Sequence, residues 1–360
     1  MNSILFVIPS LSGGGAERVV SVWASELAKM GECVHLLVFF RAENEYSLDD
    51  SVHLRSISPS KEAYDGMPLW KKLLAVRRAF KEIRPETVIP FLPHVGLMVA
   101  AAKVFLPISV IETIRNNPRA VPERRLFRWL RNLSVTFSRR CIVQTGEQLS
   151  YFPRWLHGRM AVFANPVSQE FCQACKMFTD KKIRRIVAAG RLVEQKNFPL
   201  LICAFTAIAE KDRSIGLDIY GDGPLRQTLQ TMISQAGLQE RVCLHGRTDG
   251  MAETLLRSDL YVLPSSFEGM PNSLMEAMAE GLPCISTDCP TGPADLIEHG
   301  VNGLLVPVGD APAMERAMRW MIGNAEEAAE MGRRARNTIL RRHSAHASAT
   351  ALREFIESIQ

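Results

Sequence analysis

The fold of this 360-residue chain is decided by the stretch Ser265-Ser266-Phe267-Glu268-Gly269-Met270-Pro271-Asn272-Ser273-Leu274-Met275-Glu276. An apolar run ending in Tyr261-Val262-Leu263-Pro264 precedes it and predicts a buried parallel strand. Pro271 then starts a helix that Gly281 ends, because proline suits the first helical turn and glycine suits the far end. Glu268 is therefore expected in a loop beyond a strand, and Glu276 inside the next helix.

The helix start between these two acids predicts a position for phosphate. Its free backbone N–H groups and the positive end of the helix dipole attract anions. Gly269, Met270, Pro271 and Asn272 are accordingly predicted to line this phosphate position. A carboxylate beside such a helix start can accept both hydroxyl groups of a ribose. The arrangement favours a nucleoside diphosphate that carries a reactive group.

Length and composition indicate a two-domain globular protein. The chain is about twice the length of an ordinary domain, and its hydrophobic share of 47% is normal for sizeable cores. The first residues read as a strand and lack the basic start of a signal peptide. The most apolar segment, 88–111, is interrupted by prolines and a lysine, so we expect no membrane span. The eight cysteines show no zinc spacing, and we expect a cytoplasmic protein with reduced thiols.

Apolar strands and helical segments alternate along the whole chain, which predicts an α/β protein with two doubly wound parallel sheets. We expect an N-terminal domain over 1–167, a second domain over 168–340, and a final helix over 341–360. The polar run up to Lys182 is the expected linker. Ligands of such sheets bind beyond the C-terminal ends of the strands.

Several segments resemble one known family. Glu268 and Glu276, separated by seven residues, resemble the E-x7-E signature of retaining GT-B glycosyltransferases, in particular glycosyltransferase family four. Three further segments are similar to elements of that family, namely Gly190-Arg191-Leu192-Val193-Glu194-Gln195-Lys196-Asn197, Gly13-Gly14-Gly15-Ala16-Glu17-Arg18 and Gly221-Asp222-Gly223-Pro224. The resemblance implies the GT-B fold, in which two Rossmann-like domains face each other across a cleft and a last helix crosses back to the first domain.

The resemblance also implies roles for single residues. Glu276 would hold the ribose, while Arg191 and Lys196 would hold the two phosphates in place of a divalent metal. Glu268 would contact the sugar hydroxyls or the positive charge of the transition state. Neither a metal nor another cofactor is then required, and the chain contains no Asp-x-Asp motif.

The resemblance suggests further candidate site residues, and some of them also have a purely structural interpretation. Gly14 and Gly15 would let the backbone approach a ligand closely. His94 would contact the donor sugar or the transition state, but a lone histidine is more often structural. Arg247 would flank the nucleotide base, or belong to a turn. Arg115, in an Arg-Asn-Asn-Pro segment, would face the acceptor. Gly221 and Gly223 either line the donor site or form a tight turn.

Positive charge is concentrated between Arg115 and Arg140, where eight arginines accompany one acid, Glu123. Residues Arg119–Arg140 interleave arginines with leucine, phenylalanine and tryptophan, a pattern typical of a helix on an anionic membrane surface. The alternative is a solvated basic face on an ordinary domain helix. Nothing resembles a module that reads nucleic-acid bases, so we expect no nucleic-acid partner.

The sequence therefore predicts a retaining, metal-independent glycosyltransferase. It would move a hexose or N-acetylhexosamine from a nucleotide sugar, with UDP favoured, to a hydroxyl of a lipid-linked cell-surface glycan such as capsule, exopolysaccharide or the O-antigen of lipopolysaccharide. It would be cytoplasmic and peripheral on the inner face of the cell membrane. The alternatives are another GT-B enzyme, such as a nucleotide-sugar epimerase or a phosphorylase, and a non-catalytic nucleotide-sugar-binding partner in an assembly complex.

Overall fold

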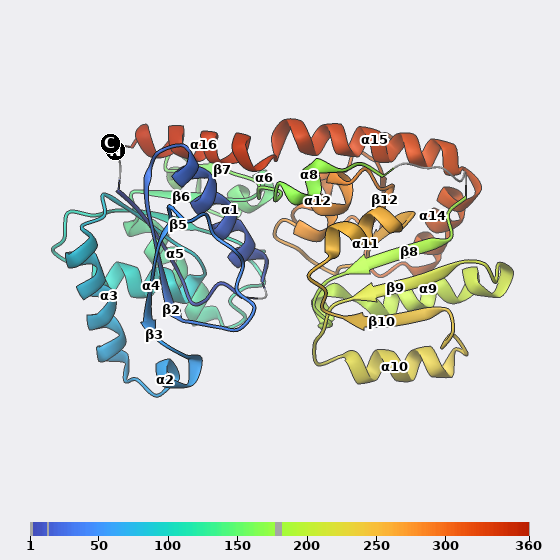
Figure 1. The fold of residues 1–360 in the computed structure, drawn as a ribbon, viewed down its shortest axis with the longest axis horizontal. Helices are drawn as coiled ribbons and strands as arrows, with labels where there is room; N and C mark the ends of the chain where they lie inside the picture. Colours follow the sequence, from blue (N-terminus) through green and yellow to red (C-terminus); the bar gives the residue numbers. More distant parts are fainter. Residues whose placement is uncertain (1–2, 13, 177–181, 360) are drawn as a thin grey trace. The chain divides into compact units, whose positions relative to one another are not determined.

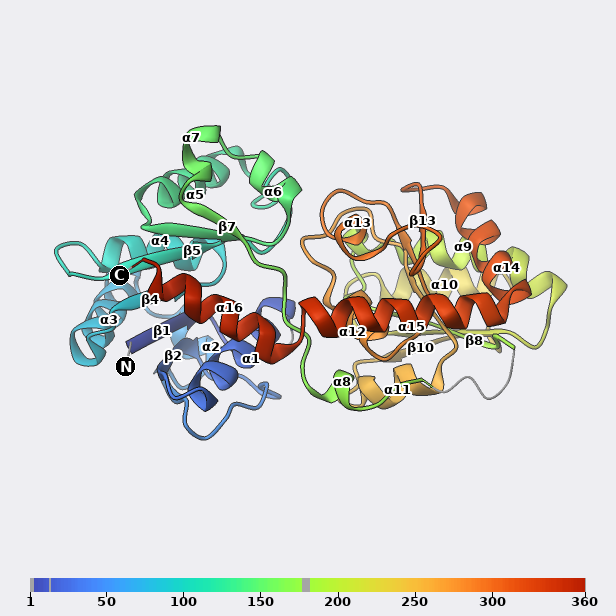
Figure 2. The same ribbon diagram turned by 90° about the horizontal axis from the view of Figure 1, so that it is seen from above.

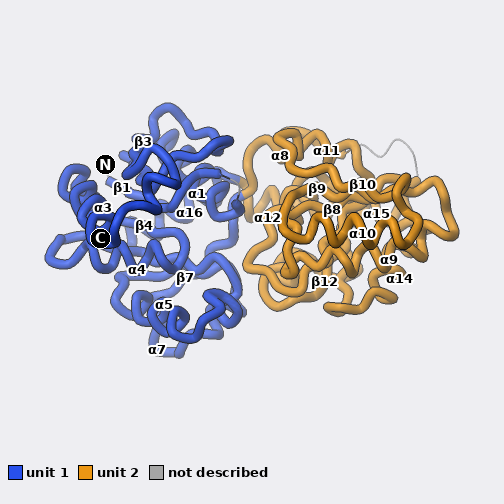
Figure 3. The backbone as a smooth tube through the Cα atoms, turned by 90° about the horizontal axis from the view of Figure 1, so that it is seen from below, with its two compact units in different colours: residues 1–166, 345–360 blue, residues 167–344 orange. Residues whose placement is uncertain are grey.

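A computed structural model describes residues 3–12, 14–176 and 182–359. The chain divides into two compact units (Figure 3). Unit 1 comprises Met1–Pro166 together with Ala345–Gln360, and unit 2 comprises Val167–Ser344. Gly13 and positions 177–181 of the expected linker lie outside the described residues. None of the helices in the described ranges combines the length and the apolar character needed to cross a bilayer.

Unit 1 is built on a seven-stranded parallel sheet in the order β3-β2-β1-β4-β5-β6-β7 (Figure 1). Its strands are β1 (Ser3–Ile8), β2 (Cys33–Phe40), β3 (His53–Ser58), β4 (Thr87–Pro90), β5 (Ser109–Thr113), β6 (Arg140–Val143) and β7 (Met160–Val162). Alternate side chains of β1 point to opposite faces. Ile4, Phe6 and Ile8 join one core cluster, and Leu5 and Val7 join another.

Helices cover both faces of this sheet. Helices α1 (Gly15–Lys29) and α16 (Ala345–Glu357) pack side by side on one face (Figures 1 and 2). The Trp23 indole N–H donates to Ser348 Oγ at 2.9 Å, which joins the end of the chain to its beginning. Helices α3 (Leu69–Ile83), α4 (Pro93–Ala102) and α5 (Arg125–Phe137) form the other layer, with α4 in contact with both neighbours. Shorter helices are α2 (Lys61–Asp65), α6 (Gly146–Ser150) and α7 (Arg154–His157).

Unit 2 is built on a six-stranded parallel sheet in the order β10-β9-β8-β11-β12-β13. Its strands are β8 (Arg185–Ala189), β9 (Gly216–Tyr220), β10 (Val242–Gly246), β11 (Leu260–Leu263), β12 (Cys284–Thr287) and β13 (Leu304–Val306). Helices α9 (Phe198–Lys211), α10 (Arg226–Gln235) and α14 (Ala311–Gly323) share one core cluster with the sheet.

The remaining helices of unit 2 include a packed pair, α12 (Asn272–Ala279) and α15 (Ala325–Arg342). The others are α8 (Glu170–Gln173), α11 (Met251–Arg257), α13 (Pro293–Leu296) and the 3-10 helix η1 (Glu194–Lys196). In each sheet the strand order reverses once, between β1 and β4 in unit 1 and between β8 and β11 in unit 2. Ligand sites of doubly wound sheets lie at such switch points.

The structure corrects the expected helix over Arg119–Arg140. Helix α5 begins only at Arg125 and ends at Phe137. Pro118 and Pro122 explain the late start, because proline lacks a backbone N–H and its ring clashes with the preceding turn of a helix. Strands β3 and β7 are the edge strands of the unit 1 sheet, and both are at most half-buried along most of their length.

Candidate active site

Two oppositely charged side chains meet at the switch point of unit 2. Lys196 ends η1 in the loop after β8, and Glu268 lies in the loop after β11. The Lys196 Nζ lies 2.6 Å from Glu268 Oε1, and the two side chains are only 15% and 6% exposed. Because β8 and β11 are adjacent parallel strands, their C-terminal ends bring together residues that are 72 positions apart in sequence.

Further hydrogen bonds fix the Glu268 carboxylate. Ser265 Oγ donates to Glu268 Oε1 at 2.5 Å, and Gln195 Nε2 donates to Oε2 at 3.3 Å. Gln195 Nε2 also donates to the Phe267 carbonyl at 2.9 Å, and Thr291 Oγ1 donates to the Glu268 carbonyl. The sequence analysis did not select Gln195, Ser265 or Thr291, although Gln195 and Ser265 each lie in a motif it quoted. Their shared contacts with Glu268 give this acid a defined position.

The loop after β12 completes this position. Gly292 has a left-handed backbone with φ of 93°, and an added Cβ would lie 2.7 Å from both the Gly269 carbonyl oxygen and Pro271 Cδ. Glycine at this position therefore lets the two loops touch. Cys289 lies in the same loop, and burial together with the Glu268 charge raises the pKa of its thiol to about 12. The thiol is therefore protonated at neutral pH and is a poor nucleophile.

Helix α12 carries the second acid of the motif. Glu276 lies in the middle of the helix and is only 4% exposed. The Tyr261 hydroxyl donates to Ser273 Oγ at 2.7 Å, which ties the first turn of the helix to β11. Burial raises the pKa of Tyr261, so the phenol keeps the proton that it donates. Met270 and Pro271 are buried just before the helix, and Asn272 is its first residue.

Arg191 and the neighbouring glycines lie on the loops after β8 and β9. Arg191 is exposed, and its guanidinium has no hydrogen bond or ion pair within the described parts of the chain. The Gly190 N–H donates to the Tyr220 carbonyl and the Leu192 N–H to the Asp222 carbonyl, both at 2.9 Å. A Cβ on Gly221 would clash with the Gly190 carbonyl. Gly221 is therefore required for the close approach of these two loops.

Arg247 follows β10 and is exposed. Two residues of β10, Cys243 and His245, form with Asp218 of the neighbouring strand β9 a group that could hold a metal ion. His245 Nε2 lies 2.5 Å from Asp218 Oδ1, and the His245 ring stacks on Tyr220 with ring centroids 4.5 Å apart. The residues predicted to bind the donor do not belong to this group.

Unit 1 places three predicted residues at its own switch point. Gly14 is the N-cap of α1 after β1, and Gly15 is the first residue of that helix. His94 lies in the first turn of α4, after β4, and its side chain is exposed. Desolvation by neighbouring atoms lowers the pKa of His94, so the imidazole is neutral at pH 7. Leu92, the N-cap of α4, has φ of 79°, a strained conformation for a branched residue.

Two buried ionisable side chains of unit 1 belong to β5 or to the residues just after it, and the first is Arg115. The Arg115 guanidinium stacks over the rings of Trp23 and Phe91, with centroid distances of 4.5 and 4.6 Å, and donates to Asn165 Oδ1 at 3.1 Å. Its Nε and Nη2 atoms are buried and have no hydrogen-bond partner within the described residues. Burial lowers the pKa of Arg115 to about 9.

Glu112, inside β5, was missed by the sequence analysis because it reads as part of an apolar strand. Its carboxylate lies against Gly96 of α4, where an added Cβ would clash with it. Burial raises the pKa of Glu112 to about 7, and the Ser134 hydroxyl and the Lys103 charge only partly oppose this effect.

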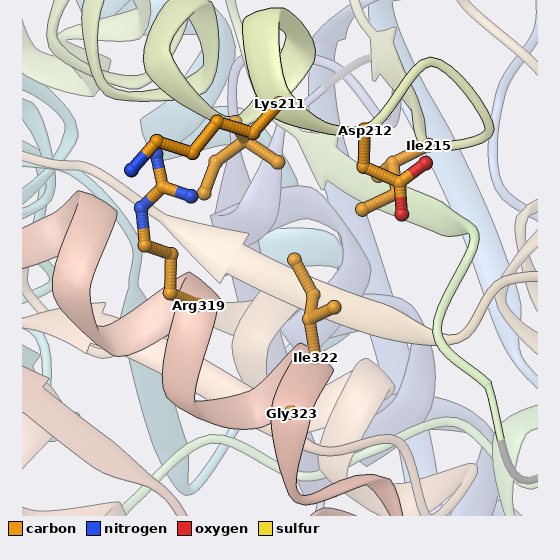
Figure 4. Close-up of a pocket in the computed structure, with 7 residues that line it drawn as sticks. Lys211, Asp212, Ile215, Arg319, Ile322 and Gly323 are labelled. Carbon is orange, nitrogen blue, oxygen red and sulfur yellow. The ribbon is translucent and has the colours of Figure 1, made fainter.

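A shallow pocket on unit 2 lies away from all these residues (Figure 4). Ile208, Lys211 and Asp212 of the α9 end and Arg319 and Ile322 of α14 line it. Arg319 is already paired there with Glu315 at 2.7 Å and with the Ala207 carbonyl at 2.7 Å. None of the predicted site residues lines this pocket, and we assign it no role.

Comparisons with known proteins find similarity to glycosyltransferases. Residues 176–338 match the model of the family described as glycosyl transferases group 1. The chain is 28% identical over 334 residues, 90% of each chain, to the GalNAc-alpha-(1->4)-GalNAc-alpha-(1->3)-diNAcBac-PP-undecaprenol alpha-1,4-N-acetyl-D-galactosaminyltransferase of Campylobacter jejuni. The matched family segment lies inside unit 2, and this relative extends the similarity to most of the chain.

Solved structures identify the fold. TarM of S. aureus, in complex with Fondaparinux, alpha-GlcNAc-glycerol and UDP, superposes with a TM-score of 0.83 at 16% identity over 100% of both chains. HepE of Anabaena, in complex with UDP and glucose, superposes with a TM-score of 0.82 at 17% identity over 99% of both chains. The two parallel sheets with alternating helices and these neighbours establish a two-domain α/β GT-B fold.

Proposed function

We propose that this protein is a retaining glycosyltransferase that moves a hexose or N-acetylhexosamine from a UDP-sugar to a hydroxyl of a lipid-linked cell-surface glycan. The match to group 1 glycosyl transferases and the similarity to the Campylobacter jejuni N-acetyl-D-galactosaminyltransferase, whose name contains an undecaprenol-linked glycan, support the glycosyltransferase assignment. The observation that carries the proposal is the buried Lys196–Glu268 pair at the switch point of the unit 2 sheet. Its place between two strand ends is where a doubly wound sheet binds a nucleotide.

In this proposal the donor diphosphate is bound by cations and backbone groups. Arg191 is exposed and unpaired within the described residues, so its fork of N–H groups is available to phosphate oxygens. The Lys196 ammonium would bind the second phosphate while it keeps its contact with Glu268. The backbone from Gly269 to Asn272 would add donors at the start of α12. Charge on the leaving diphosphate would thus be neutralised without a metal or other cofactor.

Glu276 and Arg247 would hold the nucleoside. Glu276 lies four residues into α12, so its carboxylate is one turn from the helix start that would receive the phosphates. It would accept the two ribose hydroxyls. Arg247 would flank the base, which relatives with bound UDP suggest is uracil. The proposal therefore includes uracil as the base and a hexose or N-acetylhexosamine as the sugar.

Glu268 would act on the sugar ring. Four protein groups hold this acid in one position, counting Lys196, Ser265, Gln195 and the Thr291 hydroxyl on its carbonyl. A carboxylate fixed in this way stabilises positive charge at a developing oxocarbenium ion more effectively than a mobile one. The acceptor hydroxyl would attack from the side of the leaving phosphate, which would take its proton, so the anomeric configuration would be retained.

The acceptor would be bound by unit 1. Gly14 and Gly15 at the start of α1, His94 at the start of α4 and Arg115 after β5 all follow strand ends of the same sheet. A neutral His94 could accept or donate a hydrogen bond to a sugar hydroxyl.

Helix α5 would attach the enzyme to an anionic membrane surface. On most surface helices the apolar side faces the core, but here Leu126, Phe127, Trp129, Leu133 and Phe137 are exposed. Arg131 is instead buried, and it donates to the Pro118 and Val121 carbonyls at 3.0 and 2.6 Å. Arg124 and Arg125 are exposed beside the apolar side chains. An outward apolar face with basic neighbours suits a bilayer interface.

The experiment is UDP release from a panel of UDP-sugars, measured with and without lipid-linked oligosaccharide acceptors. Acceptor-dependent UDP release with a product of retained anomeric configuration is expected, and it should persist in EDTA. Arg191→Ala should lower kcat/KM roughly 10–100-fold through weaker phosphate binding, with unfolding unchanged because the side chain is exposed. Formation of free 2-epimer without acceptor would contradict the transferase proposal, and activity lost in EDTA would contradict metal independence.

A further inference from the structure

Unit 1 exposes a second group of large apolar side chains, outside α5. Its members lie at the start of α3 and in the turn between α4 and β5, and we call them the α3 patch: Leu69, Trp70, Leu74, Val104 and Phe105. Phe105 is 96% exposed, Leu69 73% and Trp70 59%. Single exposed apolar residues need no explanation, but several on neighbouring segments point to an interaction surface.

The turn that presents Phe105 is held in place by α3. The Arg77 guanidinium donates to the Ala102 and Val104 carbonyls, each at 2.7 Å. Trp70, Leu74 and Arg77 are spaced by four and three residues along α3, so they lie on neighbouring positions of one helix side. The turn therefore adjoins the exposed apolar residues of the helix.

Phe105 adopts φ of 61°, which is a strained conformation for a large side chain. The Leu106 N–H donates to the Lys103 carbonyl at 2.7 Å, which keeps the turn tight. The strain has no packing benefit, because the ring has almost no contact with the rest of the chain. Strained residues that are held by their surroundings are enriched at functional positions.

The α3 patch and the exposed residues of α5 belong to the same layer of helices. We call Leu126, Phe127, Trp129, Leu133 and Phe137 the α5 patch. Helix α4 packs against both α3 and α5 on one face of the unit 1 sheet (Figures 1 and 2). The helices that carry the two patches thus lie in one layer, on either side of α4.

Charge favours a bilayer as the occupant. Lys71 is exposed next to Trp70 with its Nζ 5.4 Å from the ring centroid, and Lys72 and Lys103 are half-buried nearby. Burial lowers the pKa of Lys103, and the Glu112 charge partly opposes this effect. Aromatic rings with flanking lysines are typical of residues at a membrane interface. A single protruding ring also fits penetration between lipids better than it fits a flat protein surface.

We propose that unit 1 docks on an anionic lipid bilayer at two points, the α5 patch and the α3 patch, with the Phe105 ring inserted at the acyl boundary. The inference rests on the proposed membrane attachment of α5 and is independent of the proposed transfer chemistry. Two separated contacts fix the rotation of unit 1 on the surface, whereas one helix would leave it free to roll. The orientation would keep the acceptor side of unit 1 at a constant height above the lipid headgroups.

The test is co-sedimentation of the full chain with phosphatidylcholine vesicles that contain or lack phosphatidylglycerol. Phe105→Ser and Trp70→Ser are each expected to weaken binding about tenfold, since each removes one aromatic ring that would be buried in the bilayer. Phe105→Leu keeps an apolar side chain and should bind nearly as wild type. Val308→Ser changes an exposed apolar residue of unit 2 and serves as the matched control. Lipids with brominated acyl chains should quench the tryptophan fluorescence of the wild type. A smaller quench in Trp70→Phe would show direct contact of Trp70, with the remainder coming from Trp129 of the α5 patch.

Each outcome bears on a different part of the proposal. Wild-type binding by Phe105→Ser and Trp70→Ser, with loss of binding by Trp129→Ser, would overturn the α3 contact and leave the α5 contact. Failure of the wild-type chain to bind either kind of vesicle would overturn both contacts. Concentration-dependent dimers that Phe105→Ser abolishes would assign the patch to a second copy of the chain and overturn the membrane contact. UDP release with a water-soluble acceptor tests the transfer chemistry separately, and Phe105→Ser should leave it unchanged.

Discussion

The two sheets differ in how the buried charges at or beside their strands are balanced. In unit 2 the Lys196 ammonium and the Glu268 carboxylate are 2.6 Å apart and nearly inaccessible. In unit 1 the Arg115 guanidinium has two buried N–H groups without a partner within the described residues, and Glu112 is buried against Gly96. Two sheets of the same design thus carry a matched pair in one case and unmatched charges in the other.

The difference shows how each sheet accommodates buried charge. A buried charge costs free energy unless it is paired. The pair in unit 2 keeps a cation and an anion in place before a ligand arrives. In unit 1 the cost appears as displaced pKa values, lowered to about 9 for Arg115 and raised to about 7 for Glu112, in both cases by burial. We therefore expect substitutions at the two edges to act in opposite directions.

The largest effect is expected from Lys196→Met, which breaks the matched pair. It would leave the Glu268 carboxylate buried without its cation, at a cost of about 3 kcal/mol in the free energy of unfolding. Transfer should fall roughly 10²–10³-fold as well, because the same ammonium is proposed to bind the leaving diphosphate. Urea unfolding and UDP release measure the two effects. Lys182→Met, an exposed lysine of the same unit, is the control, and equal behaviour of the two variants would contradict the pairing.

The next effect is expected from Glu112→Gln, which removes an unmatched charge. The pKa of Glu112 is raised from 4.5 to about 7 in the folded protein, so the folded state keeps the proton to higher pH than the unfolded state. The wild-type free energy of unfolding should fall as pH rises from about 4.5 to about 7 and stay low above that. At pH 8 the variant should be more stable by up to about 3 kcal/mol, and near pH 4.5 the two should converge.

Urea unfolding at several pH values checks the prediction for Glu112. Glu123→Gln, which changes an exposed carboxylate of unit 1, provides the reference. A higher free energy of unfolding for the wild type than for Glu112→Gln at pH 8 would contradict the prediction, because it would mean that the buried carboxylate has a stabilising partner.

The smallest effect on stability is expected from Arg115→Met. The variant loses one hydrogen bond to Asn165 and the stacking on Trp23 and Phe91, but it also removes a buried unmatched cation. Replacement of a buried charge by an apolar side chain of similar size is often nearly neutral, so we expect a change within about 1 kcal/mol. If Arg115 faces the acceptor, KM for the acceptor should rise while KM for the UDP-sugar stays constant. A loss of stability as large as that of Lys196→Met would contradict the contrast.

The sequence predicted the α/β class and the position of Glu268 and Glu276 because local signals define them. Period-two and continuous apolar runs mark strands, and Pro271 and Gly281 mark the limits of a helix. The same reasoning failed for α5, where it correctly found an amphipathic helix but could not tell which side is exposed. Arg131 reads as a surface residue, yet it is buried and satisfied by backbone carbonyls of a loop about ten residues earlier. The hydropathy pattern alone does not predict these hydrogen bonds.

By itself the sequence determined the order of the elements, the loops that carry charge, and the resemblance to GT-B glycosyltransferases, since these depend on neighbouring residues in the chain. Only the tertiary structure brought Lys196 to Glu268, placed Gln195, Ser265 and Thr291 around that acid, and left the apolar side of α5 and the Phe105 turn exposed. The physical reason is the pairing of strands β8 and β11 and the layering of helices on each sheet. Those contacts join residues far apart in sequence, and their geometry decides which charges meet and which apolar side chains remain outside.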